Sequence, residues 1–265
     1  MTGPIAAPEP TRSLVSDIRH YFICRPAVPT LVKFETDAVR EDYTQRIAQR
    51  VGIDVSQYSV LNIHRIGIDA PVRYVFEEIV GWRGDSPYWP NHLATLQIER
   101  GRPEDVRVVL LGRSIGGWLG SVTGGQLGTL FEMHARTIRA FPGDSDVDNA
   151  RYLLWDCSGG YPIGIFSVFA RSPIAARNEV ESTQLFFAVG FNPYGRWFLS
   201  GIRPVRRVWE AIHNRVTSNV LNRFKGLCEV GFQAAREGRV MSSDDGLGVA
   251  FSNPLPPGET ATLED

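Results

Sequence analysis

The C-terminal part of the chain ends in a long segment whose apolar residues repeat at helical spacing. After Pro204 the apolar stripe comprises Val205, Val208, Trp209, Ile212, Val216, Val220, Leu221, Phe224, Leu227, Cys228, Gly231 and Phe232. These positions predict one amphipathic helix of about nine turns, roughly 45–50 Å long. Six basic and three acidic residues between 204 and 237 lie mostly off this stripe. A single long helix with an apolar face needs a sheet to pack against.

Predicted strands upstream supply that sheet. Segments rich in apolar and β-branched residues alternate with turn signals made of Gly, Pro, Ser and Asp. The expected strands are residues 93–99, 105–111, 129–141, 151–157, 163–171 and 178–191. The turns between them are short enough for hairpins, and no helical pattern intervenes. The sequence therefore predicts an antiparallel sheet rather than a doubly wound parallel one.

The region before these strands, together with the C-terminal end, completes the organisation of the chain. Residues 1–12 form an arm expected to be disordered, and residues 13–57 form an N-terminal extension with a helix predicted at 36–51. A strand is predicted at 59–68, and Pro71 suits the first turn of a helix over Val72–Val80. The polar, Pro-bearing segment 238–265 carries a net charge of −4 and is expected to be a disordered acidic tail.

Charge and cysteine content restrict the class of protein. The 28 basic and 29 acidic residues give a net charge of −1, so no chain-wide positive field favours nucleic acid. Three widely spaced cysteines suggest a reducing compartment rather than a disulfide framework. We see no secretory signal and no uncharged apolar run of the roughly 20 residues that a spanning helix requires. A cytoplasmic protein is the expectation.

The order of these elements resembles the helix-grip fold of the SRPBCC superfamily, which includes START lipid-binding domains and polyketide aromatase/cyclases. The residues that carry the resemblance are the strand-to-helix segment 66–76, the Tyr88-Trp89-Pro90-Asn91-His92 connector and the Gly-Thr segment 127–133. The resemblance covers about residues 58–235 and leaves the N-terminal extension outside. It implies an α+β fold in which a curved antiparallel sheet wraps the long C-terminal helix around an apolar cavity.

Three polar residues are candidates for acid–base chemistry. His64 and Asn62 share a strand face with Ile66 and Ile68, so all four would point into the apolar interior together. A histidine there could act as a general base, although a hydrogen-bonded core histidine is the more common outcome. Asp156 stands in an apolar strand, where it either faces water, pairs with an Arg or is a carboxyl of raised pKa. His92 follows the connector at the expected end of the cavity.

Six apolar and aromatic residues, together with Asn62, are candidates for ligand contact. They are Trp89, Trp118, Phe131, Met133, Trp155 and Tyr161. Along the strand 130–141, Phe131 and Met133 alternate with Glu132, His134 and Arg136, and we expect the charged triplet to face solvent. Trp118 lies in the glycine-rich stretch 110–131, which we interpret as a flap across the cavity mouth.

Two functions from different classes are compatible with these residues. In the first, the protein is a cofactor-independent cyclase/aromatase-type enzyme that acts on a polyketide-like or polyene molecule in secondary metabolism. In the second, it binds or transfers a lipid or another hydrophobic ligand without chemistry. Either way we expect a hydrophobic small molecule as partner, with no metal, no cofactor and no nucleic acid. Membrane contact is the less favoured expectation, and a homodimer is left open.

Overall fold

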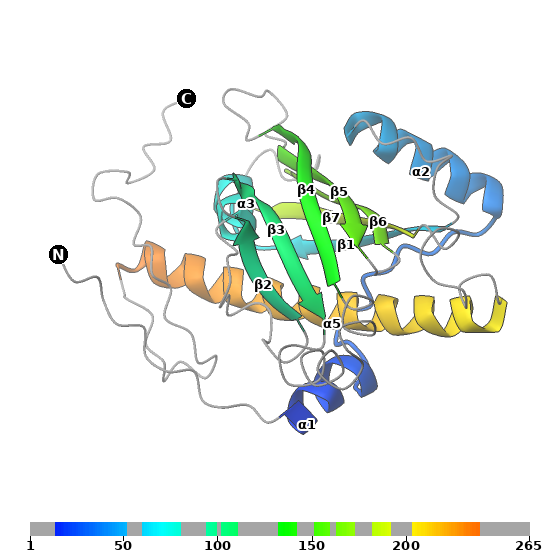
Figure 1. The fold of residues 1–265 in the computed structure, drawn as a ribbon. Coiled ribbons are helices and arrows are strands. Elements are labelled where there is room, and N and C mark those ends of the chain that lie inside the picture. Colours follow the sequence, from blue (N-terminus) through cyan, green and yellow to red (C-terminus); the bar gives the residue numbers. More distant parts are fainter. Residues whose placement is uncertain are drawn as a thin grey trace.

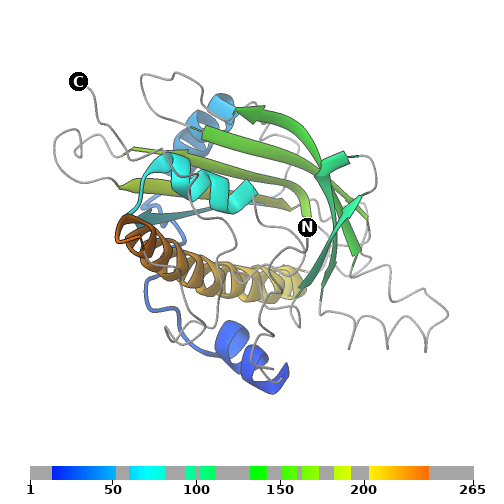
Figure 2. The same ribbon diagram turned by 90° about the vertical axis from the view of Figure 1, so that its left-hand side faces the viewer.

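A computed structural model describes residues 14–51, 60–80, 94–99, 102–110, 132–141, 151–159, 163–172, 182–191 and 203–238. These residues form a curved sheet that arches over one long helix, with further short helices around it (Figures 1 and 2). The fold is the expected α+β helix-grip arrangement. Several predicted features lie outside the described residues: the arm 1–12, the flap 110–131 except Leu110, and the acidic tail 238–265 except Gly238.

All seven described strands belong to one antiparallel sheet. Their order across the sheet is β1-β7-β6-β5-β4-β3-β2. The strands are β1 (Val60–Ile68), β2 (Ala94–Glu99), β3 (Arg102–Leu110), β4 (Glu132–Phe141), β5 (Arg151–Gly159), β6 (Ile163–Arg171) and β7 (Thr183–Phe191). From β2 to β7, strands that follow one another in the sequence are neighbours in the sheet, as hairpin connections require. The first strand, β1, pairs with the last, β7.

The C-terminal helix α5 (Arg203–Arg236) runs in the same direction as β1 and beside it. Near the start of β1, Asn62 contacts Asn214; at its end, Gly67 contacts Lys225. The five residue-to-residue steps along the strand span about 17 Å at 3.3 Å each, and the eleven steps along the helix also span about 17 Å at 1.5 Å each. Equal lengths keep the strand and the helix in register.

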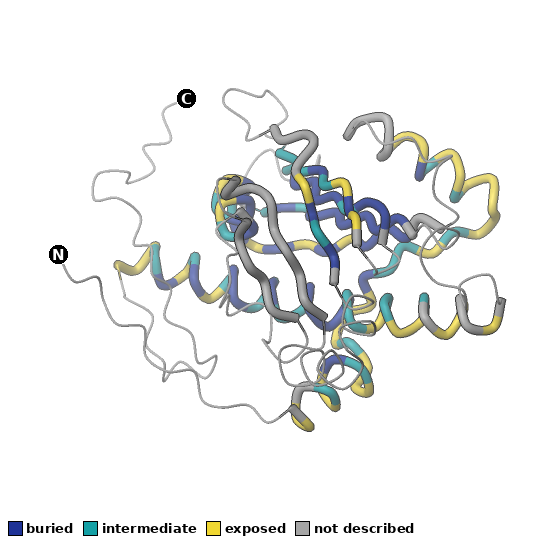
Figure 3. The backbone as a smooth tube through the Cα atoms, viewed as in Figure 1, coloured by how far each residue is buried: buried dark blue, intermediate teal, exposed yellow. Residues whose placement is uncertain are grey.

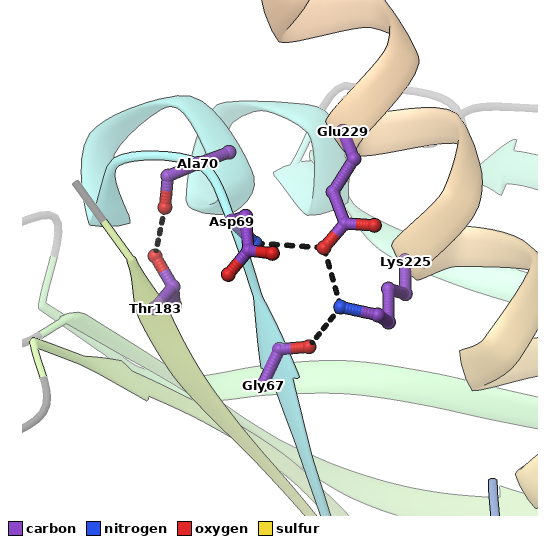
Figure 4. Close-up of polar contacts among 6 residues, drawn as sticks. All are labelled: Gly67, Asp69, Ala70, Thr183, Lys225 and Glu229. Carbon is purple, nitrogen blue, oxygen red and sulfur yellow. Dashed lines mark hydrogen bonds and ion pairs between the residues drawn. The ribbon is translucent and has the colours of Figure 1, made fainter. Parts of the chain in front are cut away.

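Figure 4 shows how the end of β1 is attached to α5. The ammonium of Lys225 donates to the Gly67 carbonyl at 2.8 Å and forms an ion pair with Glu229. The Glu229 carboxylate also accepts the Asp69 backbone N–H at 2.8 Å. Both side chains of this pair are only partly exposed. The end of β1 and the turn into helix α3 (Val72–Val80) are therefore fixed to the long helix by two polar contacts, and the ion pair holds the two helix side chains together.

The sheet buries apolar side chains on both faces. The inner core, between the sheet, α3 and α5, is made of Ile66, Ile68, Ala70, Val72, Val75, Ile79, Met133, Ala135, Cys157, Val168, Ala170, Leu185, Phe187, Val189, Leu221, Phe224, Leu227 and Cys228. The outer cluster, on the opposite face, is made of Ile63, Leu154, Ile165, Phe169, Phe186 and Ala188. Because successive strand residues point to opposite faces, each central strand contributes to both groups.

The N-terminal extension covers α5 on the side away from the sheet. Helix α1 (Leu14–Ile18) leads into a π-helical turn, η1 (Arg19–Ile23), whose Tyr21 is fully buried against Val220. The side-chain amide of Asn219 donates to the backbone carbonyls of His20, Tyr21 and Cys24 at 3.2, 2.8 and 3.2 Å. In Figures 1 and 2, α5 accordingly lies between α1 and the sheet.

The extension then continues along the free edge of β1 and onto the outer face of the sheet. The backbone N–H of Val32 donates to the Ile63 carbonyl, and that of Arg65 donates to the Thr30 carbonyl, at 2.9 and 2.8 Å. Helix α2 (Asp37–Val51) follows, and its Tyr43 packs with Val32 on the outer cluster. The extension therefore covers part of the outer face of the sheet, and residues 30–32 close an unpaired strand edge.

Removing the amide of Asn219 should destabilise the protein. In Asn219→Ala three buried or partly buried carbonyls of the η1 turn lose their donor, which costs about 1–3 kcal/mol. Urea denaturation followed by circular dichroism measures this loss. Gln233→Ala is the matched control, because Gln233 is exposed and donates to the exposed Glu237 on the same helix, and we expect a change within about 0.5 kcal/mol. Equal stability of the two variants would contradict the role given to Asn219.

Candidate functional site

A buried polar cluster lies where β1, α5 and the N-terminal extension meet. Its members are Thr30, Asn62, His64 and Ser218, each at most 5% exposed, and the partly exposed Asn214. The strand β1 directs Asn62 and His64 to the same side as Ile66 and Ile68, as the sequence predicts. The helix supplies Asn214 and Ser218 four residues apart, which places them one turn from each other on a single face.

The donor and the acceptor of each hydrogen bond in this cluster can be assigned in turn. Asn62 Nδ2 donates to Asn214 Oδ1 at 2.9 Å, so that oxygen is an acceptor, and His64 Nε2 lies 3.3 Å from the same atom. Nε2 therefore carries the proton, and Nδ1 accepts from the Thr30 hydroxyl at 2.9 Å. The Thr30 oxygen in turn accepts from Ser218 at 2.9 Å. Both ring nitrogens of His64 are engaged.

Burial keeps this histidine neutral. Loss of water around the ring lowers the pKa of His64 from 6.5 to about 4, an effect that the hydrogen bond to Asn214 opposes. Burial and the neighbouring His64 also lower the pKa of His213 to about 4. Since a general base works best with a pKa near the working pH, the surroundings of His64 favour the hydrogen-bonded core histidine over the catalytic one.

Asp156 lies on the other face of the sheet from His64. Its neighbours Trp155 and Cys157 pack in or against the inner core, whereas Leu154, two residues away, belongs to the outer cluster. The alternation along β5 therefore points Asp156 outward, and the side chain is exposed. The structure thus agrees with the water-facing alternative for Asp156 and does not bring it together with His64.

Aromatic side chains gather on the inner face of β5, β6 and β7. The ring of Phe166 lies 5.3 Å from that of Trp155 and 4.3 Å, edge to face, from that of Phe187. Phe187 is 8% exposed, whereas Trp155 and Phe166 pack against the inner core but keep part of their surface accessible. Met133 is also buried in this core, as we expected, and Arg136 on the opposite side of β4 is exposed.

Five of the predicted site residues lie outside the part of the chain that the structure describes. They are His92, Trp89, Trp118, Phe131 and Tyr161. Sequence reasoning in turn missed Thr30, Phe166, Asn214 and Ser218. The two helix residues could have been found from their four-residue spacing, and Phe166 from the alternation along its strand. Thr30 has no local signal, because only the tertiary structure brings it to His64.

No group of three or more potential metal ligands occurs among the described residues. Over the same ranges, every helix is too short or too polar to cross a bilayer.

Comparisons with known proteins find similar solved structures. The sequence matches no family model and no curated protein. Among solved structures, the Zhui aromatase/cyclase from Streptomyces sp. R1128 is 17% identical, with 64% of this chain and 93% of that one covered and a TM-score of 0.42. A polyketide-cyclase-like protein from Corynebacterium glutamicum is 15% identical, with 67% and 94% covered and a TM-score of 0.38. The similar structures thus include polyketide aromatase/cyclases, and the likeness concerns the fold alone.

The low pKa values predict that stability depends on pH. Both histidines bind a proton in the unfolded chain near pH 6.5 but in the folded protein only near pH 4. Stability is therefore complete above about pH 6.5 and is lost as the pH falls toward 4, by at most about 1.4 kcal/mol per pH unit for each histidine. The loss should be smaller for His213, which is partly exposed.

Urea denaturation at a series of pH values between 4.5 and 7.5 tests this dependence. In His64→Gln the dependence should become shallower, because one of the two protons taken up on unfolding is gone. A variant whose stability follows the same curve as the wild type would show that His64 is not the group responsible.

Proposed function

We propose that this protein binds a hydrophobic, polyketide-like molecule against the inner face of its sheet and directs its cyclisation. The observation that carries the proposal is the aromatic group of Trp155, Phe166 and Phe187, whose first two members face the inner core yet remain partly accessible. Aromatic rings and the thioether of Met133 offer large apolar contact area to a flat, conjugated chain. The sequence resemblance to aromatase/cyclases supplies the proposed reaction class.

Orientation of the bound chain is the main catalytic effect in this proposal. A long flexible substrate reaches a ring-forming conformer rarely in water, and a shaped apolar surface that holds this conformer removes much of that entropy cost. Such catalysis needs little acid–base assistance. This matters here because His64 has both ring nitrogens in hydrogen bonds and Asp156 lies on the outer face.

The same two facts favour a second candidate function, which is binding or transfer of a hydrophobic ligand without chemistry. Among the described residues, the predicted acid and base do not meet. A carrier would use the same aromatic group and would release its ligand unchanged.

Ligand binding is tested with a neutral fluorescent probe, N-phenyl-1-naphthylamine. We expect Trp155→Ala to weaken probe binding about tenfold, since loss of one aromatic contact of this kind costs about 1.4 kcal/mol. Tyr152→Ala is the matched control: Tyr152 is a partly exposed aromatic residue of the same strand, but it packs on the outer cluster. Equal effects of the two substitutions would place the probe elsewhere and refute this site.

Chemistry is tested by adding a linear poly-β-ketone thioester and following products by mass spectrometry. A cyclase converts the thioester to one ring product faster than the spontaneous reaction, and Trp155→Ala slows this conversion. Asp156→Asn should leave it unchanged. If His64 moves a proton, His64→Gln lowers turnover about a hundredfold while the probe still binds. A protein that returns the thioester intact and unaccelerated is the carrier.

A further inference from the structure

One side of α5 is covered by another segment of the chain over part of its length and is exposed over another part. Val208, Ile212, Arg215 and Asn219 follow one another in steps of four, three and four residues, so they lie on the same side of the helix. At Arg215 and Asn219 this side is covered by η1, because their side chains donate to the backbone carbonyls of that turn. This is the side of α5 that faces away from the sheet (Figure 2).

One and two turns earlier the same side is exposed to solvent. Val208 is 60% exposed and Ile212 38% exposed. Figure 3 shows exposed segments along this first part of α5. Ile23, at the end of η1, is 64% exposed, and its backbone carbonyl accepts from Arg215, which lies on this side of α5, at 3.4 Å. We call Ile23, Val208 and Ile212 the end patch. Val208 and Ile212 lie one turn apart on one side of the helix, and neighbouring exposed aliphatic side chains indicate an interaction surface more strongly than scattered ones do.

The two segments that carry the end patch are rich in arginine. Residues 14–25 and 203–216 together contain six Arg, no Lys and two acidic residues, Asp17 and Glu210, which gives +4 with His neutral, whereas the whole chain carries −1. The side chains of Arg19, Arg25, Arg207 and Arg215 are exposed. Glu210 stands two residues from both Val208 and Ile212, about 200° around the helix, and so faces away from them.

We propose that the end patch docks the protein on an anionic phospholipid surface. In this arrangement the three aliphatic side chains enter the boundary between headgroups and acyl chains, and the arginines contact lipid phosphates. Exposed apolar residues in arginine-rich segments match such a surface in both respects, whereas a protein partner would need opposing acidic residues. The contact is peripheral, and it uses different residues from the ligand surface on the sheet, so the two proposals stand or fall separately.

Vesicle co-sedimentation tests this docking with the full chain. We expect the protein to sediment with vesicles of phosphatidylcholine mixed with phosphatidylserine, to remain in solution with phosphatidylcholine alone, and to dissociate as salt is raised. Val208→Glu combined with Ile212→Glu should weaken binding about tenfold or more, and so should Arg207→Glu, since apolar insertion and charge both contribute.

Matched controls carry the same changes at exposed positions away from the patch. Val39→Glu on α2 and Val230→Glu near the other end of α5 alter valines that are 49% and 38% exposed, and Arg236→Glu reverses an exposed charge. These variants should bind like the wild type. Absence of binding to anionic vesicles, or equal loss in the controls, overturns the proposal. So does a dimer in light scattering that the double Val208 and Ile212 variant dissociates, because the occupant is then a second copy of the chain.

Discussion

Helix α5 is packed between the sheet on one side and the N-terminal extension on the other, and the rest of this structure depends on that packing. On one side, β1 runs beside the helix with matching length, and the inner core residues Leu221, Phe224 and Leu227 pack against the sheet. On the other side, Tyr21 of η1 covers Val220. A helix with apolar residues on two sides is stable in water only if both are covered. The N-terminal extension is therefore part of the folded unit that it joins.

Buried polar side chains attach the N-terminal extension to α5 and β1. Asn219 fixes the η1 turn, and the series from Ser218 through Thr30 to His64 fixes the edge segment beside β1. A buried polar atom without a partner costs about 1–3 kcal/mol, so each of these groups stabilises one arrangement of the chain over its alternatives. Burial lowers the pKa of His64 to about 4, so the ring takes part in this series of hydrogen bonds as a neutral side chain.

The sequence predicted most of the fold because the relevant signals are local. Periodicity identified the long helix, the strands, α2 and the helix Val72–Val80, whose observed bounds are the predicted ones. Alternation placed Asn62, His64 and Met133 on the inner face correctly. The sequence did not predict the α1–η1 segment. Tyr21 is buried against Val220, which is far away in the sequence, so no local periodicity marks it as a core residue. Asp156 was ambiguous for a related reason: which face of a strand is inner depends on what packs against it.

The two sides of α5 also meet different chemical surroundings. Toward the sheet, the accessible aromatic rings of Trp155 and Phe166 are uncharged and suit an apolar molecule held by its shape. Away from the sheet, the exposed Val208 and Ile212 belong to an arginine-rich part of the helix and suit a surface that is apolar and anionic at once. A near-neutral whole-chain charge hides this division, since the net value of −1 averages a positive end of one helix against acidic residues elsewhere. The distribution of charge along α5, rather than its sum over the chain, is therefore what bears on the partners of this protein.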